Sequence, residues 1–379
     1  MKSNIRVRKV IGSYDISLLL LVVLLCAFGI VMIYSTSYYN ADRYYSESAL
    51  YYSMQIRNVI IGAVGMIAVS LFDYHLYIKR LWRNVKPLHL FYILCFTLQI
   101  IVAVAGYSAN GSSRWLNIGP VNIQPSELTK ICFILMSAYL VTKCKGSLDK
   151  IWGVLPLLGA LGPIALLVAM HDLSTALVLV GIAFVSALIV SGFRRYHLVF
   201  IGAGGLFLVL FISFFGYRAE RLQVWLNPEL QDAGSQTVQG LYAIASGGLF
   251  GKGLGEGLQK LGKIQEVHTD MIFTVICEEL GIAGAILVII TFVLLLWRIY
   301  VVAVNARDMF GGVICAGVFT HIALQLVLNL LVVTNSIPAT GIPLPFISYG
   351  GTSLVVLLLE MGLVLNVSKQ IPGEGAADA

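Results

Sequence analysis

Long apolar runs without charge constrain the fold more than any other feature of this sequence. No charged residue lies between Ile16 and Ala41, and the part from Ile16 to Tyr34 is almost wholly apolar. About 20 such residues, coiled as a helix, cross the hydrocarbon core of a bilayer. The run is too long for a signal peptide and lacks a small-residue cleavage site after it, and similar runs follow. The sequence therefore predicts a polytopic all-α membrane protein.

The composition agrees with a chain that lies mostly in lipid. Only 12% of its 379 residues are charged and 58% are hydrophobic, whereas a soluble globular domain has about 25% charged residues. We predict one integral-membrane domain over residues 1–379, with a short tail at 370–379. The ten predicted transmembrane helices cover 16–36, 56–72, 87–106, 126–142, 151–170, 173–191, 197–216, 270–297, 309–336 and 351–367.

The placement of basic residues predicts the orientation. Cytoplasmic loops of membrane proteins carry an excess of Lys and Arg, so we expect both termini to be cytoplasmic in a multi-pass protein. The net charge of +6 is then a signal of topology and not of nucleic-acid binding. The predicted inner segments hold 16 of the 25 basic residues: Lys2, Arg6, Arg8, Lys9, Lys79, Arg80, Arg83, Lys86, Lys143, Lys145, Lys150, Arg194, Arg195, Arg298, Arg307 and Lys369.

One large extracellular loop, residues 217–269, is predicted between the seventh and eighth spans. Connections of this length are usually functional or disordered, and this one is not of low complexity. Its first part can form an amphipathic helix with Arg218 and Arg221 on one face. Its second part predicts a short helix that ends at Gly247–Gly248 and is followed by glycine-rich turns.

The "GKGLGEG" run, Gly251–Gly257, does not match a nucleotide-binding loop. A Walker A loop needs a glycine and a Ser or Thr where this chain has Ser246 and Gly253. Backbone N–H groups in glycine turns can still hold an anion. Lys252 beside them therefore makes an extracellular phosphate site one interpretation, and a simple flexible turn is the other.

Glu127 and Lys130 lie three residues apart at the start of the fourth span, and so on one helical face. The preceding Pro125 and Ser126 predict a helix start with Ser126 as the cap. An ordinary capped helix with a local ion pair would account for this pattern. Ionisable groups at such a depth, however, normally face a protein interior or a water-filled cavity. We therefore favour a functional role for the pair.

Carboxylates recur around the start of the eighth span. Asp270 lies where the outer loop meets the membrane, and a carboxylate that a polar substrate can reach can act as a general base. Glu278 and Glu279 lie two turns deeper, where we expect pairing within the bundle. Gln325 and Asn329 of the ninth span we interpret as interhelical hydrogen-bonding groups, which are common in membrane bundles.

Two further polar or irregular segments lie at span boundaries. Asp172, between the fifth and sixth spans, is most simply a cap of the sixth helix. The proline-rich segment Thr340–Ser353 predicts non-helical backbone at membrane depth, which persists only where it is buried in protein or lines a cavity. We therefore expect this segment to form a re-entrant loop that walls an outer cavity.

With these motifs the sequence resembles the SEDS family, the RodA, FtsW and SpoVE proteins of bacterial cell-wall synthesis. The resemblance covers nearly the whole chain. A few departures, such as "HDLST" at 171–175 where the family often has "PDLGT", leave the elongation, division or sporulation type open. The resemblance rests on five blocks in order: "SSRWLNIGPVNIQPSELTK", "YRAERL", "AIASGGLFGKGLGEG", "EVHTDMIFTVICEELGIAG" and "TGIPLPFISYGGTS".

The resemblance implies a peptidoglycan glycosyltransferase of the bacterial cytoplasmic membrane. Such an enzyme polymerises lipid II on the extracellular face, with a class B penicillin-binding protein as its transpeptidase partner. The acid of the "HTD" block, here Asp270, would be catalytic. The residues implied or expected to contact substrate are Arg114, Trp115, Glu127, Lys130, Arg218, Arg221, Lys252 and His268.

Our mechanistic hypothesis is a single displacement with inversion. Asp270 would accept the proton of the attacking sugar hydroxyl, while basic residues stabilise the undecaprenyl pyrophosphate leaving group. A divalent cation, Mg²⁺ or Mn²⁺, could share the pyrophosphate, although no ligand cluster in the sequence requires one. Two alternatives stay open: a lipid II flippase or transporter, and a non-catalytic division scaffold.

Overall fold

A computed structural model describes most of the chain. The described residues are 14–45, 50–81, 85–109, 112–118, 121–148, 150–192, 197–198, 202, 222–230, 235–261, 264 and 267–371.

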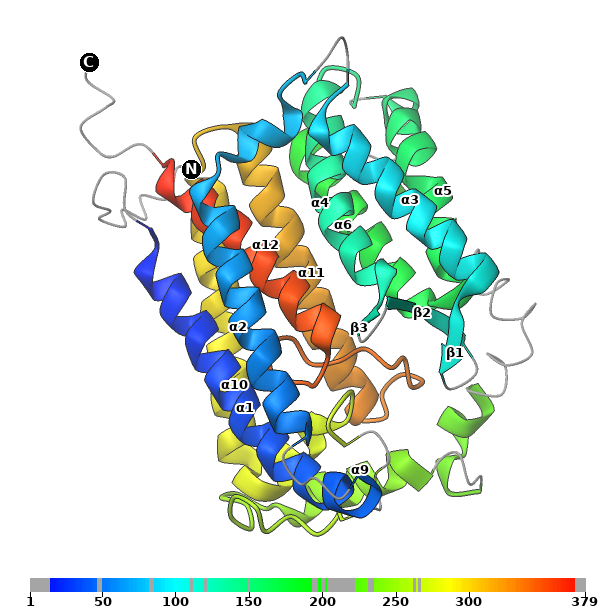
Figure 1. Cartoon of the computed structure of the whole chain (residues 1–379), viewed down its shortest axis with the longest axis vertical. Coiled ribbons are helices and arrows are strands. Elements are labelled where there is room, and N and C mark those ends of the chain that lie inside the picture. The colour runs from blue at the N-terminus through cyan, green and yellow to red at the C-terminus, as the bar shows by residue number, and fades with distance from the viewer. Residues whose placement is uncertain are drawn as a thin grey trace.

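The described part is a helical bundle with one small sheet (Figure 1). The helices of the bundle are α1 (Ile16–Tyr45), α2 (Leu50–Leu71), α3 (Pro87–Ala105), α4 (Pro125–Lys143), α5 (Leu155–His171), α6 (Leu173–Ser191), α10 (Ile272–Val304), α11 (Met309–Val333) and α12 (Gly351–Lys369). The shorter elements are η1 (Tyr74–Ile78), β1 (Tyr107–Ala109), β2 (Ser112–Ile118), β3 (Val121–Ile123), η2 (Ile151–Val154), η3 (Pro228–Leu230) and α9 (Ser235–Ser246).

Eight of the described helices are long and apolar enough to cross a membrane. They are α1, α2, α3, α5, α6, α10, α11 and α12. The helix α4 has a similar length, but its first turns hold Glu127 and Lys130 and are therefore more polar. The prediction of an all-α, multi-pass membrane protein is confirmed. The predicted seventh span, 197–216, lies almost wholly outside the described residues, so the count of ten and the orientation stay predictions.

The helix α12 is the most deeply buried of the eight candidate spans and lies between α2 and α11 (Figure 1). It packs most extensively on α2, where a Cβ atom at Gly362 would stand 2.6 Å from the carbonyl oxygen of Met66. Glycine is required at 362 because the two backbones approach so closely. At one end of this contact, the amide nitrogen of Asn366 donates to the carbonyls of Ser70 (2.8 Å) and Phe72 (2.6 Å). These bonds satisfy carbonyl groups at the C-terminal end of α2, which have no donor within that helix.

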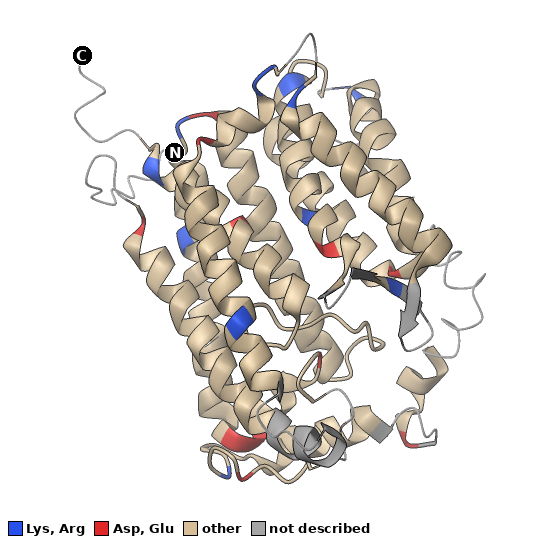
Figure 2. Ribbon diagram, viewed as in Figure 1, with Lys and Arg blue, Asp and Glu red and all other residues tan. Residues whose placement is uncertain are grey.

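Charged residues gather mainly toward the two ends of the bundle, and few lie along the helices (Figure 2). One exception is the pair of His321 on α11 and Glu360 on α12, which is fully buried with Nδ1 and Oε2 2.7 Å apart. A buried polar group needs a partner because burial removes its hydration. This pair therefore links two central helices through side chains that neither helix could bury alone.

The helix α10 is interrupted at Gly281, whose backbone has a positive φ (φ 66°, ψ −168°). The turn that follows α9 closes this break with backbone hydrogen bonds. The N–H groups of Lys252 and Gly253 donate to the carbonyls of Glu278 and Glu279, each at 3.0 Å. The N–H groups of residues 282 and 283 donate to the carbonyls of 248 and 249, also at 3.0 Å. The predicted short helix is α9, and it ends at Ser246 as expected.

The two deeper carboxylates of α10 are bound by lysines of the same turn region. Lys252 Nζ lies 2.7 Å from Glu278, which also accepts the backbone N–H of Leu258 at 3.0 Å. Lys260 Nζ lies 2.5 Å from Glu279. Pairing was expected, but the partners come from the loop and not from another helix of the bundle.

A cluster of titratable groups joins η1 to α11 at the opposite end of the bundle. His75 Nδ1 lies 2.7 Å from Asp73, and its Nε2 contacts Asp308, the cap of α11. Burial by itself lowers the pKa of His75, but the two carboxylates outweigh it and raise this pKa above its ordinary value. The charged form of His75 therefore stabilises this contact.

We predict a pH-dependent loss of stability on replacing His75 with Gln. A raised pKa in the folded state gives stability that is complete below about pH 6.5, the unfolded value, and that is lost as pH rises through the folded value. The difference in Tm between wild type and His75→Gln in detergent should therefore be largest in mild acid and shrink at alkaline pH. The control is His75→Gln in an Asp308→Asn background, because this carboxylate is one of the two that raise the pKa of His75 and its removal should weaken the pH trend. A difference that is equal at all pH values would contradict the assignment.

Candidate active site

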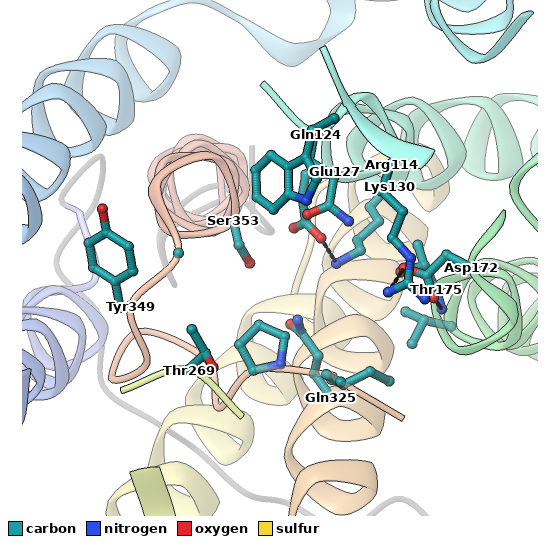
Figure 3. Close-up of a pocket in the computed structure, with 16 residues that line it drawn as sticks. Arg114, Gln124, Glu127, Lys130, Asp172, Thr175, Thr269, Gln325, Tyr349 and Ser353 are labelled. Carbon is teal, nitrogen blue, oxygen red and sulfur yellow. Dashed lines mark hydrogen bonds and ion pairs between the residues drawn. The ribbon is translucent and has the colours of Figure 1, made fainter. Parts of the chain in front are cut away.

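A cavity of about 150 Å³ opens among α4, α6, α11, β2 and the proline-rich segment 340–350. Figure 3 shows the side chains that converge on it, with basic groups on one wall and the segment around Thr269 and Tyr349 on the other. The segment 340–350 is non-helical, and its residues Gly341, Ile342 and Pro343 line the cavity. This segment therefore walls a cavity as expected, whereas its re-entrant course and the outer position of the cavity stay predictions.

The first polar wall comes from the start of α4. Lys130 Nζ lies 2.7 Å from Glu127 Oε1, and both side chains are almost fully buried. The second oxygen of Glu127 has no hydrogen-bond partner among the described residues. The predicted cap at Ser126 is wrong: Pro125 is the first residue of α4 and Gln124 is its cap, two residues before the predicted one. Proline fits there because the first N–H of a helix has no partner inside the helix.

The second polar wall joins β2 to α6. The guanidinium of Arg114 lies 3.4 Å from Asp172, and its Nε donates to the carbonyl of His171 at 3.2 Å. Asp172 caps α6 as predicted, accepting the backbone N–H of Thr175 at 3.0 Å and its hydroxyl at 2.9 Å. One carboxylate therefore starts a helix and orients a cavity arginine. Trp115, next to Arg114 on β2, also lines the cavity.

Asp270 lies beside the opposite wall. Thr269 lines the cavity, whereas the half-buried side chain of Asp270 is not among the described groups that line it. Asn329 of α11 holds this backbone, since its Nδ2 donates to the carbonyls of Asp270 (2.8 Å) and Ile342 (2.9 Å). Asn329 was expected to bond between helices, but both of these carbonyls belong to non-helical segments.

The segment 344–349 holds the residues just before Asp270. The N–H of Tyr349 donates to the carbonyl of His268 at 2.8 Å, and the hydroxyl of Ser348 donates to that of Thr269 at 2.5 Å. The ring of His268 packs between Tyr51 and Tyr349, with centroids 4.5 and 5.7 Å away. His268 is thus part of an aromatic cluster next to the cavity, and it is not among the described side chains that line it.

The remaining expected site residues are not among the described residues that line the cavity. Lys252 is bound to Glu278 and is not among the described cavity residues. Arg218 and Arg221 lie outside the described residues. Gln325, for which only interhelical bonding was expected, lines the cavity, and its Oε1 has no partner in the described part of the chain. The sequence does not indicate that Gln325 lines a cavity. A polar residue that bonds to another helix and one that faces a cavity both recur at the spacing of one helical face.

Comparison with known proteins now decides the family. The model of the cell cycle protein family FtsW/RodA/SpoVE matches residues 16–372. The chain belongs to this family.

Curated relatives match this family member over nearly their whole length. Stage V sporulation protein E of Bacillus subtilis (strain 168) is 37% identical over 365 residues, which cover 94% of this chain and 97% of the relative. A protein of Trichlorobacter lovleyi named "Probable peptidoglycan glycosyltransferase FtsW" is 37% identical over 366 residues, which cover 94% of both chains.

Solved structures share the fold of this FtsW/RodA/SpoVE family member. The crystal structure of the rod shape determining protein RodA of Thermus thermophilus has a TM-score of 0.66 at 26% identity, over 95% of this chain and 98% of that one. A chain from a peptidoglycan synthase complex that coordinates polymerization and crosslinking has a TM-score of 0.77 over 94% and 98% of the two chains. Its identity is 24%, so this likeness concerns the fold alone.

We predict that the Glu127–Lys130 pair is strongly coupled in stability. Lys130→Met leaves a buried carboxylate without its cation, which costs about 3–5 kcal/mol. The double variant Glu127→Gln with Lys130→Met should recover part of this loss, as measured by unfolding in mixed micelles. Lys145→Met is the control, because Lys145 is exposed just beyond α4. Additive effects of the two single variants would contradict the coupling.

Proposed function

We propose that this protein is a peptidoglycan glycosyltransferase that polymerises lipid II. The observation that carries the proposal is the cavity with Arg114 and Lys130 on one wall and Thr269, the residue before Asp270, on the other. The name of the Trichlorobacter lovleyi relative supports the same activity. In this proposal the cavity faces the extracellular side of the bacterial cytoplasmic membrane, and the chain has ten spans with both termini in the cytoplasm.

The proposed reaction is a single displacement at the anomeric carbon of the donor. A sugar hydroxyl of the acceptor forms the new glycosidic bond, and the bond from that carbon to the pyrophosphate oxygen breaks. The hydroxyl proton passes to the carboxylate of Asp270, while undecaprenyl pyrophosphate departs with the electron pair. A carboxylate can perform this step when it lies within hydrogen-bond reach of the hydroxyl.

The pyrophosphate leaving group carries negative charge that the enzyme must stabilise. Arg114 and Lys130 are the described cations of the cavity, and guanidinium and ammonium groups bind phosphate oxygens. Each is oriented by a carboxylate, Asp172 or Glu127, so that its position is fixed before the substrate binds. Preorganised charge of this kind is usually the largest part of catalysis. Arg218 and Arg221 are proposed to join this group, and a divalent cation could do so too.

Lys252 has a different place in this proposal. Lys252 is not among the described residues that line the cavity, and its ammonium is bound to Glu278 at 2.7 Å. We therefore assign to Lys252 the attachment of the loop to α10. A class B penicillin-binding protein is the proposed partner, as the family resemblance implies.

A lipid transporter is the rival function. A carrier is expected to hold its substrate near the middle of the membrane, commonly between internal repeats. The cavity instead lies where α4, α6 and α12 begin, beside the end of the long loop before α10, and we find no repeat in the sequence. This placement favours chemistry on a substrate at one membrane surface.

We predict that Asp270→Asn abolishes glycan polymerisation without unfolding the protein. Removing a general base typically costs about 10²–10⁴-fold in rate, and the change leaves the shape of the side chain intact. The assay uses the full chain with its partner and purified lipid II, with products separated by gel electrophoresis. Glu256→Gln, an exposed loop carboxylate, is the matched control and should keep the wild-type rate.

Full polymerisation by Asp270→Asn at an unchanged Tm would rule out Asp270 as the base. It would also be the result expected of a scaffold whose partner supplies the activity. Equal loss in both variants would point to a general defect of the loop.

A further inference from the structure

The loop that follows α9 exposes an unusual amount of apolar surface. Phe250 is 83% exposed and Leu249 is 66% exposed, and Leu254, Leu258 and Leu261 are also exposed. We call residues 247–261 the apolar loop. Single exposed apolar residues are normal on a protein surface, but a contiguous group marks contact with a membrane or another molecule. Whether lipid or another molecule covers the apolar loop depends on its position along the bilayer normal, which we call its level.

Two polar contacts between α1 and α10 define that level. These helices run antiparallel and side by side (Figure 1). At one end Arg298 pairs with Asp15, and at the other the hydroxyl of Ser35 donates to Glu279 at 2.8 Å. Asp15, the residue before α1, is 20 residues from Ser35 (35 − 15), and Glu279 is 19 residues from Arg298 on α10 (298 − 279), or about 28–30 Å at 1.5 Å per residue. This separation equals the thickness of a hydrocarbon core, which is about 30 Å.

The burial pattern of α10 agrees with this boundary. Its residues from Ile272 to Glu279 are all buried in protein. Beyond the break at Gly281, one side becomes exposed and apolar at Ile282, Ile286, Leu287, Ile290, Val293 and Leu294. Such a face in a membrane protein is covered by lipid tails. The lipid-covered part of α10 therefore begins just after Glu279.

The apolar loop is fixed at this boundary by its bonds to α10. The carbonyl of Leu249 accepts the N–H of residue 283, and the N–H of Gly253 donates to the carbonyl of Glu279. A Cβ atom at Gly251 would stand 2.1 Å from that carbonyl oxygen, so the loop backbone lies directly on the helix. Leu249 and Phe250 thus lie next to the first lipid-covered turn of α10. They cannot move away from this level without breaking the closure of the helix.

Aromatic residues mark the same level on the neighbouring helices. Tyr34, one residue before Ser35, is 53% exposed and its ring packs edge-on against Tyr52 of α2 at 5.5 Å. Tyrosine is enriched where a membrane protein crosses the interface between lipid and water. The two lysines of the apolar loop are bound to Glu278 and Glu279, so their charges do not oppose contact with lipid.

We infer that the apolar loop is an interfacial anchor that inserts Leu249, Phe250 and Leu254 into the boundary region of the adjacent lipid leaflet. The occupant of this surface is lipid because the loop continues the lipid-covered face of α10 at the level of the interface. The anchor holds the break in α10 closed and so fixes the start of the helix that follows Asp270. The inference does not depend on the proposed polymerase activity, since its test contains no substrate.

The test places an environment-sensitive fluorophore on the loop of the full-length protein. Phe250→Cys and Glu256→Cys are each labelled with an NBD reagent and reconstituted into vesicles of phosphatidylethanolamine and phosphatidylglycerol. The native cysteines are buried except for the half-buried Cys144, so the labelled unsubstituted protein is the blank. Quenching is measured with iodide in water and with lipids that carry a shallow doxyl group.

We expect the label at position 250 to emit at shorter wavelength than the label at 256. Shallow doxyl lipids should quench it several-fold more strongly than they quench position 256, and iodide several-fold less. Equal iodide quenching at both positions, with no effect of doxyl lipid, would place the loop in water and overturn the inference. Protection from both quenchers at position 250 would also overturn it, because protein and not lipid would then cover the loop.

Discussion

The break in α10 at Gly281 and its closure by the apolar loop determine the structure of one end of the molecule. In lipid a backbone N–H or carbonyl without a hydrogen-bond partner costs several kcal/mol. A helix can therefore be interrupted at this depth only where other backbone groups supply the hydrogen bonds that the break removes. The loop supplies them, and Lys252 and Lys260 neutralise the two carboxylates that precede the break. The acids at 278 and 279 are therefore structural, and they fix the direction in which α10 begins after Asp270.

The position of Asp270 depends on contacts from distant parts of the chain. Asn329 of α11 binds its carbonyl, and residues 348 and 349 bind the two residues before it. The opposite wall is built in the same way, because Asp172 at the start of α6 orients Arg114 of β2. Both walls thus combine a helix with a strand or loop, and binding at the cavity can be sensitive to changes in either.

Most local features were predictable from the sequence, and the pairs that join distant segments were not. Apolar runs predict the helices because lipid leaves no other way to satisfy the backbone, and a spacing of three residues predicts the Glu127–Lys130 pair. The Ser126 cap was wrong because Pro125 takes the first helical position, which moves the cap back to the residue before it. The pairs Lys252–Glu278 and Arg114–Asp172 join separate segments, and no spacing in the sequence indicates which acid meets which base.

We propose that the cavity between Arg114 and Thr269, the residue before Asp270, receives the pyrophosphate-linked sugar of lipid II. Photo-crosslinking tests it most directly, with a lipid II analogue that carries a diazirine on its first sugar and with Asp270→Asn to prevent turnover. We expect mass spectrometry to find the label on cavity residues such as Trp115, Gln325 and Tyr349, and unlabelled lipid II to reduce this labelling. Labelling confined to helices away from the cavity, with equal competition, would contradict the account.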